Sequence, residues 1–315
     1  MISGKDITVS VPCLFPNEEP IWMMRTTCDR FGLSLRPYGM GPKTVYNGWI
    51  DMKVHRLRQE ALSCPTSHIL YTDARDAWFL AGPDEIAQKY NDLGCPPLLL
   101  SAQSDVFGTY AAWYPKVEWN EKKLFRYVGT PGQLCEAKAL ADALGWMQEH
   151  FHLGEDVDTG GLPDDDPPWW IEYMAAHPGG VRFDHDCAIF MNAGSRLPGE
   201  QDMWADCLKI IGNRVYNKLT YAWPCILHFN GGYSHAFHGK WEQLQPFWRA
   251  LGNKENPPWE AERKYNPVEG CTCGCGSKWE PINPCLPRMD LVCRCCDRHK
   301  CPLHYPLSEA TVEVR

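Results

Sequence analysis

Two aspartates, Asp73 and Asp76, follow an apolar run and are well placed to do chemistry. The run covers residues 68–72 and predicts a buried strand. In open α/β folds ligands bind at the carboxyl ends of the strands, so both carboxylates are expected there. Carboxylate oxygens suit Mg²⁺ or Mn²⁺, and a cation at that edge can neutralise a departing diphosphate. The alternative is a helix N-cap with a surface salt bridge.

A second group ends another apolar run, residues 225–229, and continues into a glycine-rich turn. The run carries His228, which could complete a metal site of two carboxylates and one imidazole. The turn contains Asn230 and Gly231, whose backbone is free to approach a phosphate. A histidine in an apolar run can equally be a hydrogen-bonded residue of the core.

A third group is the acidic cluster Asp164, Asp165 and Asp166, which precedes two prolines and two tryptophans. A carboxylate beside an acceptor hydroxyl can act as a base or can stabilise positive charge that develops on a sugar. The tryptophans offer flat faces to a sugar ring. A solvated helix N-terminus is the other interpretation of the cluster. A fourth group, residues 183–186, has the same two interpretations.

Composition describes a globular chain of enzyme size, with 44% hydrophobic residues and 14 tryptophans in 315 positions. The formal net charge of −8 excludes a surface coated with phosphate-binding lysines, although a local basic groove remains open. The N-terminus lacks the apolar stretch of a secretory signal, and no segment approaches a membrane span of roughly 20 apolar residues. We therefore expect a cytoplasmic or otherwise intracellular protein with no membrane contact.

Short β-like runs alternate with helical periodicity along the first 260 residues, which predicts an α/β sheet of Rossmann-like order. Strands are expected at residues 7–11, 33–38, 68–72, 97–102, 188–190 and 225–229. One helix is expected to start at Asn17. Four further helices are expected at residues 50–61, 83–90, 133–150 and 169–176. The first strand is not followed by a Gly-x-Gly-x-x-Gly turn, and the chain has no Walker A loop and no Gly-x-Ser-x-Gly elbow. NAD chemistry is therefore not expected.

Half of the 16 cysteines crowd together with two histidines in a C-terminal module, residues 261–315, which follows a domain of residues 1–260. So short a segment needs metal or disulfides to fold, and a reducing compartment favours metal. Ten ligands exceed the four of one tetrahedral Zn²⁺ and suffice for two ions. The expected ligands are Cys271, Cys273, Cys275, Cys285, Cys293, Cys295, Cys296, His299, Cys301 and His304. Disulfides are the alternative, and they would require secretion.

The motifs occur in an order that resembles the glycosyltransferase domain of procollagen lysyl hydroxylases. The resemblance spans roughly residues 7–248 and depends on residues 47–54, 71–76, 99–102, 164–166, 184–190 and 228–231. Its sharpest parts are the Asp-x-x-Asp strand end, the Asp-His followed by Ile-Phe, and the His-x-Asn-Gly turn.

This resemblance implies a GT-A type fold that uses a UDP-sugar and Mn²⁺, or Mg²⁺ in its place. The metal ligands implied are Asp73, Asp76 and His228. Lys53 would lie near the diphosphate, and an aromatic side chain, here Phe107, would stack on the uracil.

The resemblance also places Asp165 and Asp166 near the acceptor and the donor sugar. This chain departs from the family at Arg75, where the family has a tyrosine, and an arginine there could pair with a phosphate. It departs again at Pro167, where the family has a glutamine, and at Phe229, where the family has a glycine. Because Pro167 adjoins the implied catalytic acids, the acceptor is left open.

The sequence thus favours a metal-dependent glycosyltransferase that moves a hexose from a UDP-sugar to a hydroxyl group. The acceptor is hydroxylysine by resemblance, and the zinc module leaves a hydroxymethylated DNA base open, since such a module can dock nucleic acid or simply cap the enzyme. One alternative is a noncatalytic GT-A-fold protein whose zinc module engages a partner. Another is a metal-dependent phosphodiesterase or nuclease, although a second metal cluster is not evident.

Overall fold

The computed structural model describes residues 1–13, 21–40, 51–74, 76–106, 111–151, 166–193, 207–229 and 241–254, together with two short strands at 279–281 and 291–293. The chain divides into two compact units, Met1–Asn253 and Lys254–Arg315. The second unit contains β12 (Trp279–Pro281) and β13 (Leu291–Cys293), which pair antiparallel. Of the predicted zinc ligands only Cys293 falls within the described residues, so the zinc module stays a prediction.

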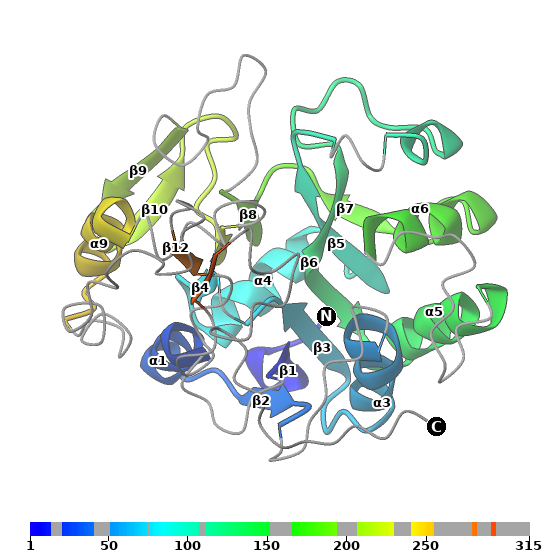
Figure 1. The fold of residues 1–315 in the computed structure, drawn as a ribbon, viewed down its shortest axis with the longest axis horizontal. Coiled ribbons are helices and arrows are strands. Elements are labelled where there is room, and N and C mark those ends of the chain that lie inside the picture. The colour runs from blue at the N-terminus through cyan, green and yellow to red at the C-terminus, as the bar shows by residue number, and fades with distance from the viewer. Residues whose placement is uncertain are drawn as a thin grey trace. The chain divides into compact units, whose positions relative to one another are not determined.

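A six-stranded sheet in the order β2-β1-β3-β6-β5-β7 forms the centre of the first unit (Figure 1). Its strands are β1 (Ile7–Pro12), β2 (Leu35–Tyr38), β3 (His68–Thr72), β5 (Leu98–Gln103), β6 (Tyr127–Glu136) and β7 (Arg182–Asp184). β6 runs antiparallel to β3 and β5, and the other pairings are parallel. The predicted α/β class is confirmed, and the carboxyl ends of five strands meet at one edge of the sheet.

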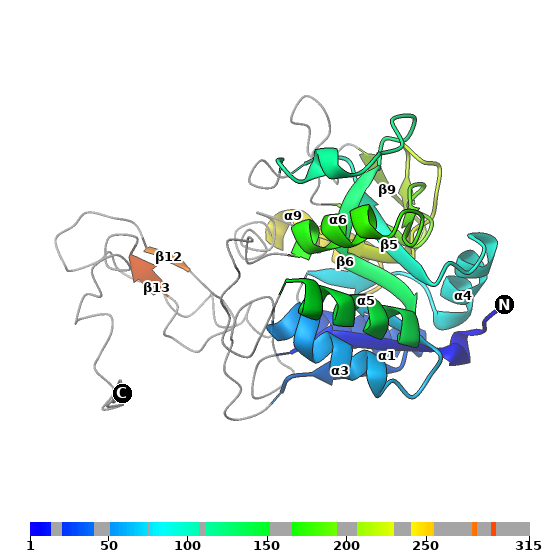
Figure 2. The same ribbon diagram turned by 90° about the vertical axis from the view of Figure 1, so that its right-hand side faces the viewer.

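Helices cover both faces of this sheet. Successive strand residues point to opposite sides, so the buried strands carry apolar side chains into a core on each face. In β3, Ile69 and Tyr71 belong to one apolar core and Leu70 to the other. The first core includes residues of the π-helix Asp51–Arg56, α3 (Leu57–Leu62), α5 (Ala137–His150) and α6 (Asp166–Ala176). The second includes residues of α1 (Trp22–Phe31) and α4 (Pro83–Asp92). Figure 2 shows α3, α5 and α6 together on one side of the sheet.

A second sheet has three strands in the order β4-β11-β8, and its strand β4 comes directly after β3 along the chain. Its strands are β4 (Ala77–Phe79), β8 (Phe190–Asn192) and β11 (Ile226–His228). The central strand, β11, is antiparallel to β4 and parallel to β8, and its register places His228 opposite Ala77 and Asn192. Every residue of these strands is buried, so a polar side chain here needs a partner within the protein.

The remaining elements of the first unit lie around these two sheets. They are the hairpin of β9 (Leu208–Ile211) and β10 (Arg214–Asn217), helix α9 (Trp241–Ala250) and the 3₁₀ turns Gly4–Asp6 and Tyr114–Lys116. Among the described residues no helix has both the length and the apolar character needed to cross a membrane. The eight cysteines described in this unit are free thiols, as predicted.

One predicted helix, over residues 133–150, has the wrong start. It begins at Ala137, since residues 133–136 are the end of β6. Leu134 packs in one core and Cys135 in the other. Because both faces of this strand are apolar, the alternation typical of a half-buried strand is missing from the sequence.

One predicted strand, residues 188–190, lies two residues further along at Phe190–Asn192. The backbone N–H groups of Ala188 and Ile189 donate to the carboxylate of Asp184, at 2.8 and 2.7 Å. Ala188 and Ile189 therefore belong to the loop before β8, and the strand begins at Phe190. The helix start expected at Asn17 lies outside the described residues.

Candidate metal centre

Three predicted metal ligands, Asp73, Asp76 and His228, meet where β3 leads into β4 and β11 ends. One ligand atom from each lies within 4.8 Å of the other two. Nε2 of His228 is 3.4 Å from Oδ1 of Asp76 and 3.8 Å from Oδ2 of Asp73. A backbone hydrogen bond holds Asp76 beside His228, because the N–H of Phe229 donates to the carbonyl of Asp76 at 2.8 Å. Residues more than 150 positions apart therefore form one cluster.

The donor set of this cluster fits a divalent cation. Two carboxylates and one imidazole offer the oxygen and nitrogen ligands that such ions take. In an octahedral site with ligand distances of about 2.1 Å, neighbouring donor atoms are about 3.0 Å apart and opposite ones about 4.2 Å. The separations of 3.4 and 3.8 Å lie between these values. Within the described part of the chain, Nε2 of His228 is buried and has no hydrogen-bond partner, as expected of a metal-binding atom.

Lys53 joins this cluster from the π-helix Asp51–Arg56, which packs in the same apolar core as α6. Its ammonium lies 2.9 Å from Oδ2 of Asp166 and 3.6 Å from Oδ1 of Asp73. Asp166 begins α6 and is only 3% exposed. The solvated helix N-terminus considered for the acidic cluster is therefore wrong for Asp166, whose carboxylate is buried against a cation.

The cluster carries an excess of negative charge. When ionised, the carboxylates of Asp73, Asp76 and Asp166 outnumber the ammonium of Lys53 by two charges. Desolvation raises the pKa of Asp73 above its ordinary value, Lys53 opposes this, and Asp76 raises the pKa further. The hydroxyl of Tyr71 donates to Oδ1 of Asp73 at 3.1 Å. A divalent cation would balance the charge that Lys53 leaves unbalanced.

Asn192, which the sequence analysis did not select, also belongs to this site. Its Oδ1 lies 3.0 Å from Nδ1 of His228, and it occupies the position opposite His228 in the ladder between β8 and β11. A single asparagine at the end of a short strand carries no local sequence signal for such a contact. The other predicted site residues, Arg75, Phe107, Asp165, Asn230 and Gly231, lie outside the described residues.

The fourth acidic group has a structural explanation. Asp184 is fully buried, and its carboxylate accepts the N–H groups of Ala188, Ile189 and Phe190 at 2.7 to 2.8 Å. It thereby holds the loop that leads into β8. Asp186, in contrast, is exposed and pairs with a lysine.

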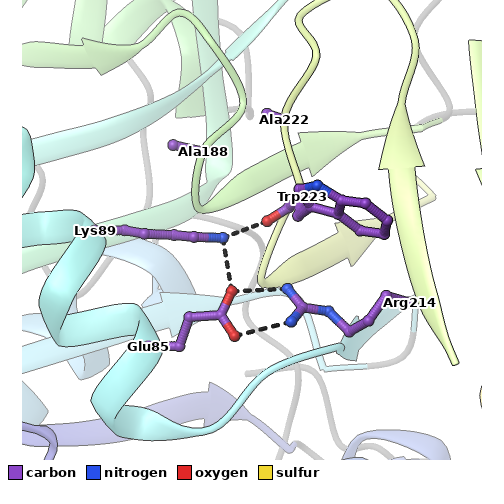
Figure 3. Close-up of a pocket in the computed structure, with 6 residues that line it drawn as sticks. All are labelled: Glu85, Lys89, Ala188, Arg214, Ala222 and Trp223. Carbon is purple, nitrogen blue, oxygen red and sulfur yellow. Dashed lines mark hydrogen bonds and ion pairs between the residues drawn. The ribbon is translucent and has the colours of Figure 1, made fainter. Parts of the chain in front are cut away.

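A hollow of about 530 Å³ lies elsewhere on the first unit (Figure 3). It is lined by Glu85, Lys89, Ala188, Arg214, Ala222 and Trp223. Ala188 and Trp223 precede β8 and β11, whereas Asn192 and His228 end these strands. The hollow is therefore at the opposite end of the second sheet from the metal cluster and does not belong to it.

The charged groups of this hollow satisfy one another, as Figure 3 shows. Arg214 donates to both carboxylate oxygens of Glu85, at 3.0 and 2.7 Å. Lys89 lies 2.8 Å from Oε1 of Glu85 and donates to the carbonyl of Trp223. This network joins α4 to the β9–β10 hairpin.

No protein-family model matches the sequence, and a comparison with curated proteins finds no match. Among solved structures, one with a similar arrangement is described as a glycosyltransferase involved in the glycosylation of the major capsid of PBCV-1. The two chains are 12% identical with a TM-score of 0.42, over 71% of this chain and 94% of that one.

Proposed function

We propose that this protein is a metal-dependent glycosyltransferase that moves a hexose from a UDP-sugar to a hydroxyl acceptor. The observation that carries the proposal is the convergence of Asp73, Asp76 and His228 at the carboxyl edge of an α/β sheet. The order of motifs along the chain, similar to that of the lysyl hydroxylase glycosyltransferase domain, supports the choice of donor.

In this proposal the three converging side chains hold Mn²⁺, or Mg²⁺. Such a cation supplies charge neutralisation for the departing UDP. Lys53 adds a buried positive charge beside Asp73 and is suited to the same diphosphate. Asp166, held by Lys53 at 2.9 Å, would orient a hydroxyl of the donor sugar. Its neighbour Asp165 is proposed to lie near the acceptor hydroxyl.

The remaining proposed contacts are with the nucleotide. Arg75 would pair with phosphate, Phe107 would stack on the uracil, and the backbone at Asn230 and Gly231 would approach the diphosphate. The C-terminal module is proposed to bind two or more Zn²⁺ through its cysteines and histidines. Zinc analysis of the purified full chain would test the last point, and less than two equivalents of zinc would contradict it.

The first experiment measures UDP release from a panel of UDP-sugars with Mn²⁺. The wild type is compared with the double variant Asp73→Asn, Asp76→Asn and with the control Asp142→Asn, an exposed aspartate on α5. We expect release from one preferred sugar in the wild type and the control, and none in the double variant. Release that persists in the double variant would contradict the proposed site.

The acceptor is tested with two substrates, a hydroxylysine peptide and DNA that contains hydroxymethylated bases. Transfer to one of them would identify the acceptor class. A folded protein that binds Mn²⁺ but releases no UDP with any donor or acceptor would favour a noncatalytic binding protein. Many nucleases use two metal ions. The described residues contain one cluster of three potential metal ligands, which does not favour the nuclease alternative.

A further inference from the structure

We infer that Asn192 is a positioning residue for the proposed metal centre, because its amide holds His228 in the tautomer that leaves Nε2 free to bind the cation. The inference deepens the proposed function and rests on it. It concerns Asn192 and the two residues that hold it, Ser101 and Gly129.

Asn192 and His228 are two buried side chains in direct contact. Asn192 is 1% exposed and His228 is 3% exposed. They are register partners in neighbouring parallel strands, so their side chains point to the same face of the sheet. Oδ1 of Asn192 lies 3.0 Å from Nδ1 of His228. Both side chains are buried, so Oδ1 of Asn192 and Nδ1 of His228 depend on each other for this hydrogen bond.

The other partners of the Asn192 amide determine its orientation. Nδ2 lies 3.0 Å from the carbonyl oxygen of Ala102 and 3.1 Å from Oγ of Ser101. A backbone carbonyl only accepts, so the amide end that faces Ala102 must be the NH₂ group. A reversed amide would leave that buried carbonyl without its donor, which is unfavourable.

The orientation of this amide determines which ring nitrogen of His228 carries the proton. With its NH₂ group fixed, Asn192 presents an oxygen to His228, and this oxygen only accepts. Nδ1 of His228 must therefore carry the proton. A neutral imidazole has one N–H, so Nε2 keeps its lone pair and points it toward Asp76 and Asp73, at 3.4 and 3.8 Å. This is the tautomer that a metal ligand bound through Nε2 requires.

Two further residues, Ser101 on β5 and Gly129 on β6, support Asn192. The hydroxyl of Ser101 donates to the carbonyl of Gly129, which leaves its oxygen lone pairs to accept from Asn192. Gly129 leaves no room for a side chain, because a Cβ there would lie 2.4 Å from Nδ2 of Asn192 and 2.7 Å from Oγ of Ser101. Strands β5, β6 and β8 thus hold one amide in one orientation.

The first test is Mn²⁺ binding to the full chain by calorimetry, without nucleotide. Loss of an outer partner of a ligand histidine typically costs about 10- to 100-fold in metal affinity, and we expect this loss for Asn192→Ala. Ser101→Ala, which leaves the Ala102 contact intact, should lose less. The matched control is Asn217→Ala, which removes a buried asparagine that contacts Met191. It should leave the affinity unchanged even where it lowers stability.

The second test reads the tautomer directly by ¹⁵N NMR of the metal-free protein. The His228 resonances are assigned by their absence in His228→Gln. We expect the wild type to show a protonated Nδ1 and a bare Nε2, and Asn192→Ala and Gly129→Ala to show a mixture of tautomers. A role limited to folding would not shift the tautomer.

The outcomes separate the two proposals. If the wild type binds no divalent cation, the proposed function fails and the inference fails with it. If the wild type binds Mn²⁺ and Asn192→Ala binds it equally well, only the inference is overturned. A wild-type His228 with its proton on Nε2 overturns the inference whatever the affinity.

Discussion

The ammonium of Lys53 lies 2.9 Å from Oδ2 of Asp166, and the two side chains are 6% and 5% exposed. They come from elements 113 residues apart in sequence, the π-helix before α3 and the start of α6. Breaking a buried pair by removing one partner typically costs about 3–5 kcal/mol, since the other charge stays buried. We expect Lys53→Met to lower the free energy of unfolding by about this amount in urea titrations.

A matched control for Lys53→Met is Lys138→Met, on the surface of α5. Lys138 pairs with Asp142, and both side chains are mostly exposed. Such pairs contribute at most about 1 kcal/mol, so this variant should unfold close to the wild type. Equal stability of the Lys53 and Lys138 variants would mean that the Lys53 contact contributes little. Added Mn²⁺ should restore part of the stability that Lys53→Met loses, because it replaces a positive charge in the cluster.

Mn²⁺ should stabilise the wild-type fold by binding to Asp73, Asp76 and His228. A ligand that binds only the folded state at 100 times its Kd adds about 2.7 kcal/mol to the free energy of unfolding. Thermal unfolding with and without Mn²⁺ should therefore show a higher Tm with the ion in the wild type and in Asp142→Asn. Asp76→Asn should show no such rise. An equal rise in Asp76→Asn would place the binding site elsewhere.

Asp184→Asn should destabilise the fold although it removes no volume. The buried carboxylate accepts three backbone N–H groups, and an amide presents an NH₂ group to at least one of them. Hydrogen bonds to a charged group contribute about 1.5–3 kcal/mol, so a loss of this size is expected in urea unfolding. Asp186→Asn, two residues away and exposed, serves as the control and should be close to neutral.

The Glu85 network should make stability depend on pH in the acid range. Burial would raise the pKa of Glu85, but hydrogen bonds from Arg214 and Lys89 outweigh it and hold the pKa below the ordinary value of 4.5. The unfolded chain therefore takes up the proton first as pH falls. The stabilisation is complete above pH 4.5 and is lost as pH falls through the lower pKa of the folded state.

Urea unfolding of the wild type and Glu85→Gln from pH 7 to 3 would check this pH dependence. The difference in free energy of unfolding between them should shrink as pH falls below 4.5. The difference in free energy of unfolding between the wild type and Arg214→Leu should shrink in the same way, because this variant removes the main partner of Glu85. A difference that is constant over the whole range would show that Glu85 titrates alike in both states.

Local sequence was sufficient for strand β3 and for the place of its two aspartates. Residues 68–72 are buried on both faces, have the apolar centre Ile69, Leu70 and Tyr71, and precede an Asp-x-x-Asp segment, so the strand and its carboxyl end could be predicted. The same logic identified His228 at the end of β11. It was less successful for β6, where apolar residues on both faces removed the alternation that marks a strand.

Contacts between distant elements could not be predicted from spacing. Lys53 and Asp166 were assigned to the site by family resemblance, and their direct contact depends on the packing of the π-helix and α6 against the same sheet face. Asn192 carried no signal at all, since its role depends on a register with His228 across two strands. Ser101 and Gly129 act one step further away.

The sequence by itself therefore determined which residues stand at the ends of the strands, because the side-chain pattern of a strand is local. Only the tertiary structure decided which of these ends meet. Pairing between β4, β8 and β11 brings Asp76, Asn192 and His228 together. Such pairing is set by hydrogen bonds and packing between segments that lie 36 or more residues apart, and no short stretch of sequence predicts it.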